Sequence, residues 1–103
     1  MAETKGYQRK YLRGIAHGMK AVVMVGQQGI TPSVLKALKE ALDQHELIKV
    51  KFVEEKSREA KVQMAAVLAR ETGSEEVGTI GHTALFYREN PDPELRKIVL
   101  PER

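Results

Sequence analysis

Two glycines three positions apart, Gly26 and Gly29, form the part of the sequence best suited to bind a ligand. They follow an apolar run at 21–25 and precede Thr31-Pro32, a typical helix start with threonine as N-cap and proline in the first turn. Glycine lets a ligand approach the backbone, and a helix N-terminus offers N–H groups and a partial positive charge. An ordinary tight turn between a strand and a helix would show the same pattern. The predicted phosphate site comprises Gly26, Gln27, Gln28, Gly29 and Thr31.

Catalytic and metal-binding patterns are absent from the sequence. The segment 26–29 lacks the third glycine of a dinucleotide fingerprint and the Gly-Lys-Ser/Thr ending of a P-loop. There is no cysteine, and the histidines at positions 17, 45 and 82 fall in separate predicted elements. Ser33 and Ser57 stand at helix starts, where capping explains them. We therefore expect no catalytic residue, no metal site, no cofactor and no enzymatic activity. A small enzyme acting on a phosphorylated metabolite is disfavoured because no acid, base or metal set accompanies the glycines.

Positive charge is concentrated at the amino-terminal end of the chain. The formal net charge is +3, yet residues 1–25 carry five basic side chains against one acidic side chain. Residues 26–56 hold equal numbers of basic and acidic residues, and residues 57–103 hold one more acidic residue than basic residues. Nucleic acid is the commonest partner of such a basic segment, although a solvated helix face would look the same. The predicted extension of the phosphate site along a nucleic-acid backbone comprises Lys5, Arg9, Lys10, Arg13 and Lys20.

Apolar periodicity and capping residues predict three helices. The first runs from about Thr4 to His17, with Gly18 as its stop; its apolar stripe of Tyr7, Tyr11, Leu12 and Ile15 is predicted to pack in the core. The second helix is capped by Thr31 and fades near residue 45. The third is capped by Ser57, reaches residue 72 and is closed by a glycine.

The remaining segments predict strands at 21–25, 47–53, 77–80 and 84–88, with a tight turn at Gly81-His82 and a short final strand at 97–100. In the second strand, Ile48, Val50 and Phe52 should face the core and Lys49 and Lys51 the other side. Phe86 and Tyr87 are neighbours, so one should face inward and the other outward, where it could stack on a base. The order α-β-α-β-α-β-β predicts an α/β fold with a mixed four-stranded sheet and helices packed on it.

Length and composition predict one compact intracellular domain. The 103 residues suit a single domain with its core at about 4–100, and 42% hydrophobic residues can build that core. The lack of cysteine argues against a disulfide-stapled secreted scaffold, and no apolar run approaches the roughly 20 residues of a membrane span. We expect a cytoplasmic monomer that does not associate with membranes.

Four strings occur in order at specific spacings: Arg13-Gly14-Ile15-Ala16-His17, Val25-Gly26-Gln27-Gln28-Gly29-Ile30-Thr31, His45-Glu46-Leu47-Ile48-Lys49-Val50-Lys51, and Ile80-Gly81-His82-Thr83 followed by Leu85-Phe86-Tyr87-Arg88. Together they resemble the CRM domain family (chloroplast RNA splicing and ribosome maturation), in its stand-alone bacterial YhbY-like form. The resemblance covers roughly residues 4 to 100.

The resemblance implies a fold similar to the carboxy-terminal domain of translation initiation factor three. It also implies RNA binding through the Gly-x-x-Gly loop and adjacent basic surface, and a partner in ribosomal RNA within large-subunit precursors. Many relatives have a basic residue between the two glycines, whereas this chain has the neutral Gln27 and Gln28. Lys20 and the first helix are therefore expected to supply more of the charge. The alternative is a protein-interaction module whose basic helix docks on an acidic protein; salt dependence and competition by bulk RNA would separate the two.

Overall fold

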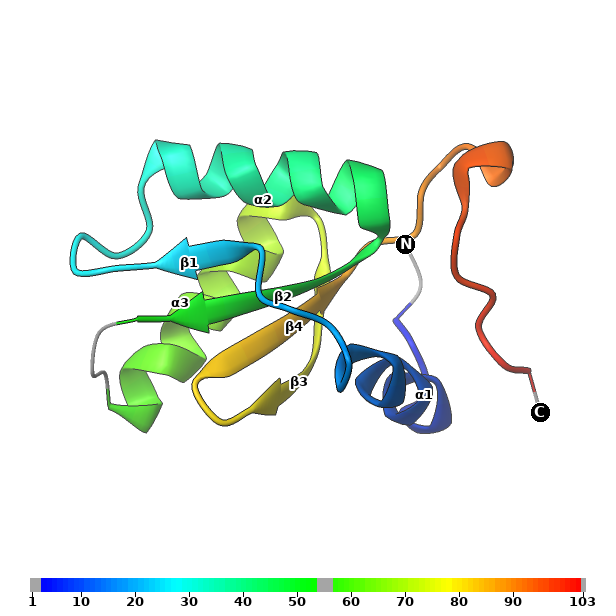
Figure 1. The fold of residues 1–103 in the computed structure, drawn as a ribbon, viewed down its shortest axis with the longest axis horizontal. Helices are drawn as coiled ribbons and strands as arrows, with labels where there is room; N and C mark the ends of the chain where they lie inside the picture. The colour runs from blue at the N-terminus through cyan, green and yellow to red at the C-terminus, as the bar shows by residue number, and fades with distance from the viewer. Residues whose placement is uncertain (1–2, 54–56, 103) are drawn as a thin grey trace.

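Within residues 3–53 and 57–102, which the computed structural model describes, three helices and four strands follow one another in the predicted order (Figure 1). A short 3-10 turn comes after the last strand. The elements are α1 (Gly6–Ala16), β1 (Val23–Val25), α2 (Pro32–His45), β2 (Leu47–Phe52), α3 (Arg58–Thr72), β3 (Glu75–Ile80), β4 (Thr83–Tyr87) and η1 (Pro93–Leu95).

Local capping chemistry sets the ends of α2 and α3. The Thr31 hydroxyl accepts the Val34 N–H at 3.2 Å, and Pro32 occupies the first turn, where its missing N–H costs nothing. The Ser57 hydroxyl likewise accepts the Ala60 N–H at 3.1 Å. Gly73 ends α3 with φ +65°, a left-handed conformation that favours glycine. The predicted starts of both helices and the end of α3 are therefore confirmed.

The strands form one mixed sheet in the order β1-β2-β4-β3. β1 and β2 are parallel and are joined by the crossover helix α2, as a parallel pair requires. β4 is antiparallel to both β2 and β3, so the last strand in the sequence lies inside the sheet. The predicted mixed four-stranded sheet is confirmed, although β1 begins at Val23 rather than at residue 21.

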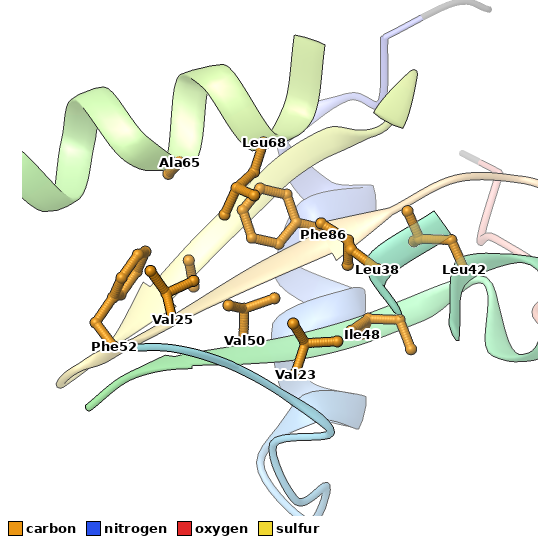
Figure 2. Close-up of a cluster of buried hydrophobic side chains, with 11 residues drawn as sticks. Val23, Val25, Leu38, Leu42, Ile48, Val50, Phe52, Ala65, Leu68 and Phe86 are labelled. Carbon is orange, nitrogen blue, oxygen red and sulfur yellow. The ribbon is translucent and has the colours of Figure 1, made fainter. Parts of the chain in front are cut away.

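Helices α2 and α3 cover one face of the sheet (Figures 1 and 2). Their apolar faces meet the strand residues that alternate toward them, as expected for Ile48, Val50 and Phe52. Burial of these side chains is the main source of stability for this layer. The buried cluster comprises Val23, Val25, Leu38, Leu42, Ile48, Val50, Phe52, Ala65, Leu68, Ala84 and Phe86.

Helix α1 and the carboxy-terminal segment cover the opposite face over β2, β3 and β4, whereas Met24 of β1 stays 56% exposed. Leu12 and Ala16 of α1 pack there with strand residues Leu47, Val77, Leu85 and Tyr87. Tyr87 is therefore only 2% exposed, and the prediction of an outward-facing aromatic on this strand is wrong. The predicted stripe of α1 is wrong in part: Leu12 is buried, but Tyr11 and Ile15 are 44% and 37% exposed.

The predicted strand at 97–100 is also wrong, because a side chain binds this segment in place of a neighbouring strand. The buried carboxylate of Glu46 accepts the N–H groups of Lys97 and Ile98 at 2.6 and 3.0 Å. Its other oxygen accepts the Asn90 N–H at 2.7 Å. Ile98 and Leu100 then pack against the α1 side of the core. The carboxy-terminal segment is thus fixed without joining the sheet.

Candidate nucleic-acid interface

The Gly26–Gly29 loop is a tight turn at the carboxyl end of β1 (Figure 1). The Gly29 N–H donates to the Gly26 carbonyl at 3.0 Å, and Gly29 has φ +72°, so the turn needs glycine at this position. Gln27 and Gln28 lie at the exposed corner. Among the described residues, no hydrogen bond engages their backbone N–H groups. These two N–H groups can therefore be offered to an anion.

The first turn of α2 adds a few donors beside this loop. The Val34 and Leu35 N–H groups are bonded to the side chain and carbonyl of Thr31, and Pro32 has none. Within the described part of the chain, the N–H of Ser33 has no hydrogen-bond acceptor. The hydroxyl hydrogen of Thr31 is also available, because that hydroxyl uses its oxygen in capping. With the partial positive charge of the helix end, this arrangement suits a phosphate oxygen.

The loop is held against β2 and α3. The Val53 N–H donates to the Val25 carbonyl at 2.9 Å, which fixes the end of β1. A β-carbon at Gly29 would lie 3.3 Å from Cε of Met64 in α3. This close approach is a second reason for glycine at position 29, and it places the first turns of α3 beside the loop.

Basic side chains of α3 lie at the same end of the molecule as the loop. Arg58 is exposed in the first turn, and Nζ of Lys61 lies 3.1 Å from Nδ1 of His82 in the β3–β4 turn. The His82 carbonyl in turn accepts the Phe52 N–H at 2.9 Å. Sequence reasoning did not include Arg58 and Lys61 among the candidate residues. The available signal was their spacing of three positions just after the Ser57 cap, which puts them on neighbouring turns of one helix.

The predicted basic residues of α1 lie on the other face of the sheet. Nη1 of Arg13 donates to the Val77 carbonyl at 3.1 Å, and its methylene stem covers Gly78, where a β-carbon would lie 2.5 Å from Arg13 Cδ. Arg9 hydrogen-bonds to the Thr4 carbonyl and lies 3.7 Å from the Glu75 carboxylate. The guanidinium group of Arg13 therefore attaches α1 to β3, and that of Arg9 attaches both α1 and the preceding residue Thr4 to the start of β3. Lys5 and Lys10 are exposed.

Lys20 is exposed just before β1, at the opposite end of this strand from the Gly26–Gly29 loop. It borders an apolar cavity whose lining includes Ile15, Val22 and Ile98. The structure thus brings the predicted loop residues and Thr31 together, and separates them from Lys20 and the basic residues of α1. Figure 1 shows this separation, with the loop at the left end and α1 at the lower right.

The sequence of this chain matches the CRS1 / YhbY (CRM) domain model over residues 5–88. The chain belongs to the CRM family. The matched range contains the whole sheet, all three helices and the Gly26–Gly29 loop, and it ends before the segment held by Glu46. The family predicted from the four strings is therefore confirmed.

Curated CRM relatives support the same assignment. An RNA-binding protein of Haemophilus influenzae is 43% identical over 93% of this chain and 93% of its own length. A probable RNA-binding protein of Pseudomonas aeruginosa is 40% identical, with coverage of 84% and 82%. The probable RNA-binding protein YqeI of Bacillus subtilis is 36% identical, with coverage of 93% and 97%.

A solved structure gives the same fold. The solution structure of a hypothetical protein of Staphylococcus aureus, described as a candidate RNA-binding protein, superposes with a TM-score of 0.80 at 31% identity. It covers 96% of this CRM chain and all of the Staphylococcus chain. The predicted α/β architecture is confirmed; the likeness to the initiation factor domain stays a prediction.

No described helix combines the length and apolar character needed to cross a membrane. In the described part of the chain, no three His, Cys, Asp or Glu side chains are grouped so that they could hold a metal ion.

Proposed function

We propose that this CRM domain binds RNA through the Gly26–Gly29 loop, and that its target is ribosomal RNA in precursors of the large ribosomal subunit. It would act in the cytoplasm, as a monomer and without enzymatic activity of its own. The observation that carries the proposal is the exposed glycine turn at the N-terminus of α2, with Arg58 and Lys61 of α3 at the same end of the molecule (Figure 1). The names of the three curated relatives agree with RNA as the partner.

The loop and the lysines would contribute in different ways. Backbone N–H groups at the loop fix the position of one phosphate but carry no net charge. Exposed Lys5, Lys10 and Lys20 would add charge from a second region, because lysine on a surface can follow a phosphate backbone. We therefore propose two separate contacts on one RNA rather than one continuous track.

The alternative function is docking of α1 on an acidic protein. It is favoured by the exposure of Tyr11 and Ile15 next to Lys10, which gives α1 an outer face that is apolar and basic together. Such a face suits an amphipathic partner. Competition separates the two functions, since bulk RNA displaces an RNA ligand and leaves a protein partner bound.

A negative charge introduced into the loop tests RNA binding. Gln28→Asp would place a negative charge close to the proposed phosphate; two unit charges about 6 Å apart repel by roughly 3 kcal/mol at an effective dielectric of about 20, before screening. We expect the affinity for a structured fragment of large-subunit ribosomal RNA to fall about tenfold or more, and Gln27→Lys to raise it.

The matched control is Gln44→Asp, the same substitution at the exposed opposite end of α2. It adds the same charge to the protein, so RNA affinity should change little by comparison. Melting curves of all three variants report on folding. Equal affinities of folded Gln28→Asp, Gln44→Asp and wild type would exclude the loop from the interface.

A further inference from the structure

A cavity of about 340 Å³ lies between the start of α3 and the β3–β4 hairpin. Phe52 and Ala84, which are almost fully buried, form an apolar floor, and the exposed side chains of Arg58 and Val62 stand at the entrance. Lys61 also lines the cavity. The volume is at the lower end of the range for ligand-binding pockets and fits a small group better than a large ligand.

Glu76 on β3 places a carboxylate in the lining of this cavity. It is partly buried, and among the described residues no hydrogen bond or ion pair engages its carboxylate. Burial raises the pKa of Glu76. A carboxylate removed from water without a partner costs stability. Its position in an open cavity makes it available to a ligand that brings hydrogen-bond donors.

The lining also selects the kind of ligand. An ionised carboxylate offers two acceptor oxygens and no donor, so it pairs best with two adjacent N–H groups. Among the RNA bases, guanine presents such a pair on its Watson–Crick edge, N1–H and the N2 amino group. Adenine, cytosine and uracil each place an acceptor beside the donor. Phe52 and Val62 can contact the faces of a base, and Arg58 and Lys61 its phosphate.

The cavity adjoins the Gly26–Gly29 loop through α3. Met64 contacts the loop at Gly29, and Lys61, one turn earlier on the same helix, lines the cavity. Phe52 at the end of β2 forms part of the floor, and its neighbour Val53 is bonded to the end of β1. An RNA strand with one phosphate bound at the Gly26–Gly29 loop would therefore pass over the first turns of α3.

We propose that the cavity between α3 and the β3–β4 hairpin receives one unpaired guanine of the bound RNA, with the Glu76 carboxylate accepting hydrogen bonds from N1–H and the N2 amino group. The proposal rests on the RNA binding proposed above and adds base specificity to it. The loop fixes a phosphate without regard to sequence, whereas Glu76 reads one base.

The test compares short single-stranded oligouridine RNAs that carry one central guanine, adenine or cytosine. Fluorescence anisotropy with wild-type protein should show tighter binding of the guanine RNA by about tenfold to a hundredfold, the usual size for a bidentate base contact. Glu76→Gln should remove this preference and leave binding of plain oligouridine intact or slightly stronger. Val62→Trp, which fills the entrance, should also remove it.

Glu59→Gln is the matched control, because Glu59 is exposed in the first turn of α3 and its loss changes the charge by the same amount. It should retain the guanine preference. A wild-type protein without the preference, or folded Glu76→Gln protein that retains it, would overturn the cavity proposal. In that case a lower affinity of Gln28→Asp for every oligonucleotide would still support RNA binding at the loop. Failure of the wild-type protein to bind any RNA would contradict both proposals.

Discussion

Glu46 is a buried carboxylate whose side-chain partners are three backbone N–H groups of the carboxy-terminal segment. The residue has φ +62°, a positive value that non-glycine residues rarely adopt. Its own carbonyl also accepts the Arg88 N–H at 2.8 Å. Charge-assisted bonds to N–H groups are stronger than neutral ones, and they offset the strain of this turn. Position 46 therefore connects α2, β2 and the carboxy-terminal segment.

Glu46→Gln should destabilise the fold. The amide keeps the shape of the side chain, but it replaces one acceptor oxygen by an NH₂ group that faces backbone donors. We expect a loss of about 2–3 kcal/mol in the free energy of unfolding, measured by urea denaturation. Glu40→Gln, an exposed change on α2, is the control. If the two variants unfold at the same urea concentration, the Glu46 bonds do not stabilise the fold.

Tyr87→Phe should be neutral or stabilising at pH 7, by up to about 1 kcal/mol. Within the described residues, the buried Tyr87 hydroxyl has no hydrogen-bond partner, so its removal leaves nothing unsatisfied.

Desolvation, with repulsion from Glu89 and Glu46, raises the pKa of Tyr87 to about 12 from about 10. Wild-type stability should therefore fall as pH rises from about 10 to 12, because the unfolded chain ionises first. Melting curves across this range should show a smaller fall for Tyr87→Phe; an equal fall would contradict this origin.

Sequence reasoning predicted the turn at Gly26–Gly29 and the capped start of α2 correctly because their signals are local: two glycines, a threonine cap and a proline within a few positions. The phosphate binding assigned to this loop stays a prediction. Sequence reasoning failed for Tyr87 because the sequence of a strand shows which residues share a face but not whether one or both faces of the sheet are covered. It failed at 97–100 because the partner of that segment is one carboxylate about fifty residues earlier, at Glu46. Arg58 and Lys61 were missed because regional charge sums do not show which distant segments share one end of the fold.

At the scale of elements, α1 is attached to β3 by side chains that sequence reasoning assigned to RNA. Arg13 donates to the Val77 carbonyl and packs over Gly78, while Arg9 lies beside Glu75. Exposed Lys5 and Lys10 have no such attachment to β3 among the described contacts. The arginines and lysines of α1 therefore separate into a group that holds the helix and a group that faces solvent.

Two double variants test this division. Arg9→Gln with Arg13→Gln should lower the melting temperature, because α1 loses its contacts to β3 and the cover over Gly78. Lys5→Gln with Lys10→Gln should leave the melting temperature unchanged. It should reduce the slope of log RNA affinity against log salt concentration by about 0.7–0.9 for each lost phosphate contact. Thermal melts and salt titrations on the same preparations give both results. An unaltered melting temperature in the arginine variant would show that these contacts do not hold α1.

For the whole molecule, 39 Å long and about 24 Å wide, the two proposed RNA contacts are far apart. The loop and the start of α3 lie at one end, and α1 lies on the opposite face toward the other end (Figure 1). Effects of distant, independent sites add. An RNA large enough to reach both regions should therefore lose affinity additively when each is altered.

Lys10→Gln, Lys61→Gln and the double variant measure this additivity. Each single variant should reduce the slope of log affinity against log salt, and the double variant should show the sum of both reductions. The titration uses one structured fragment of large-subunit ribosomal RNA. A slope that responds to Lys61→Gln but not to Lys10→Gln would remove α1 from the interface and favour its use in protein docking.

The position of β4 also constrains how the protein is made. β2 and β3 do not pair with each other; each pairs with β4, which is the last of the four strands to leave the ribosome. A nascent chain that ends before residue 83 carries all three helices but lacks the strand that joins the two halves of the sheet. Its apolar strand faces stay exposed until synthesis is nearly complete, a state prone to aggregation and to chaperone binding. Folding is therefore expected to occur late and all at once, and shortened chains that lack β4 should not accumulate as folded protein.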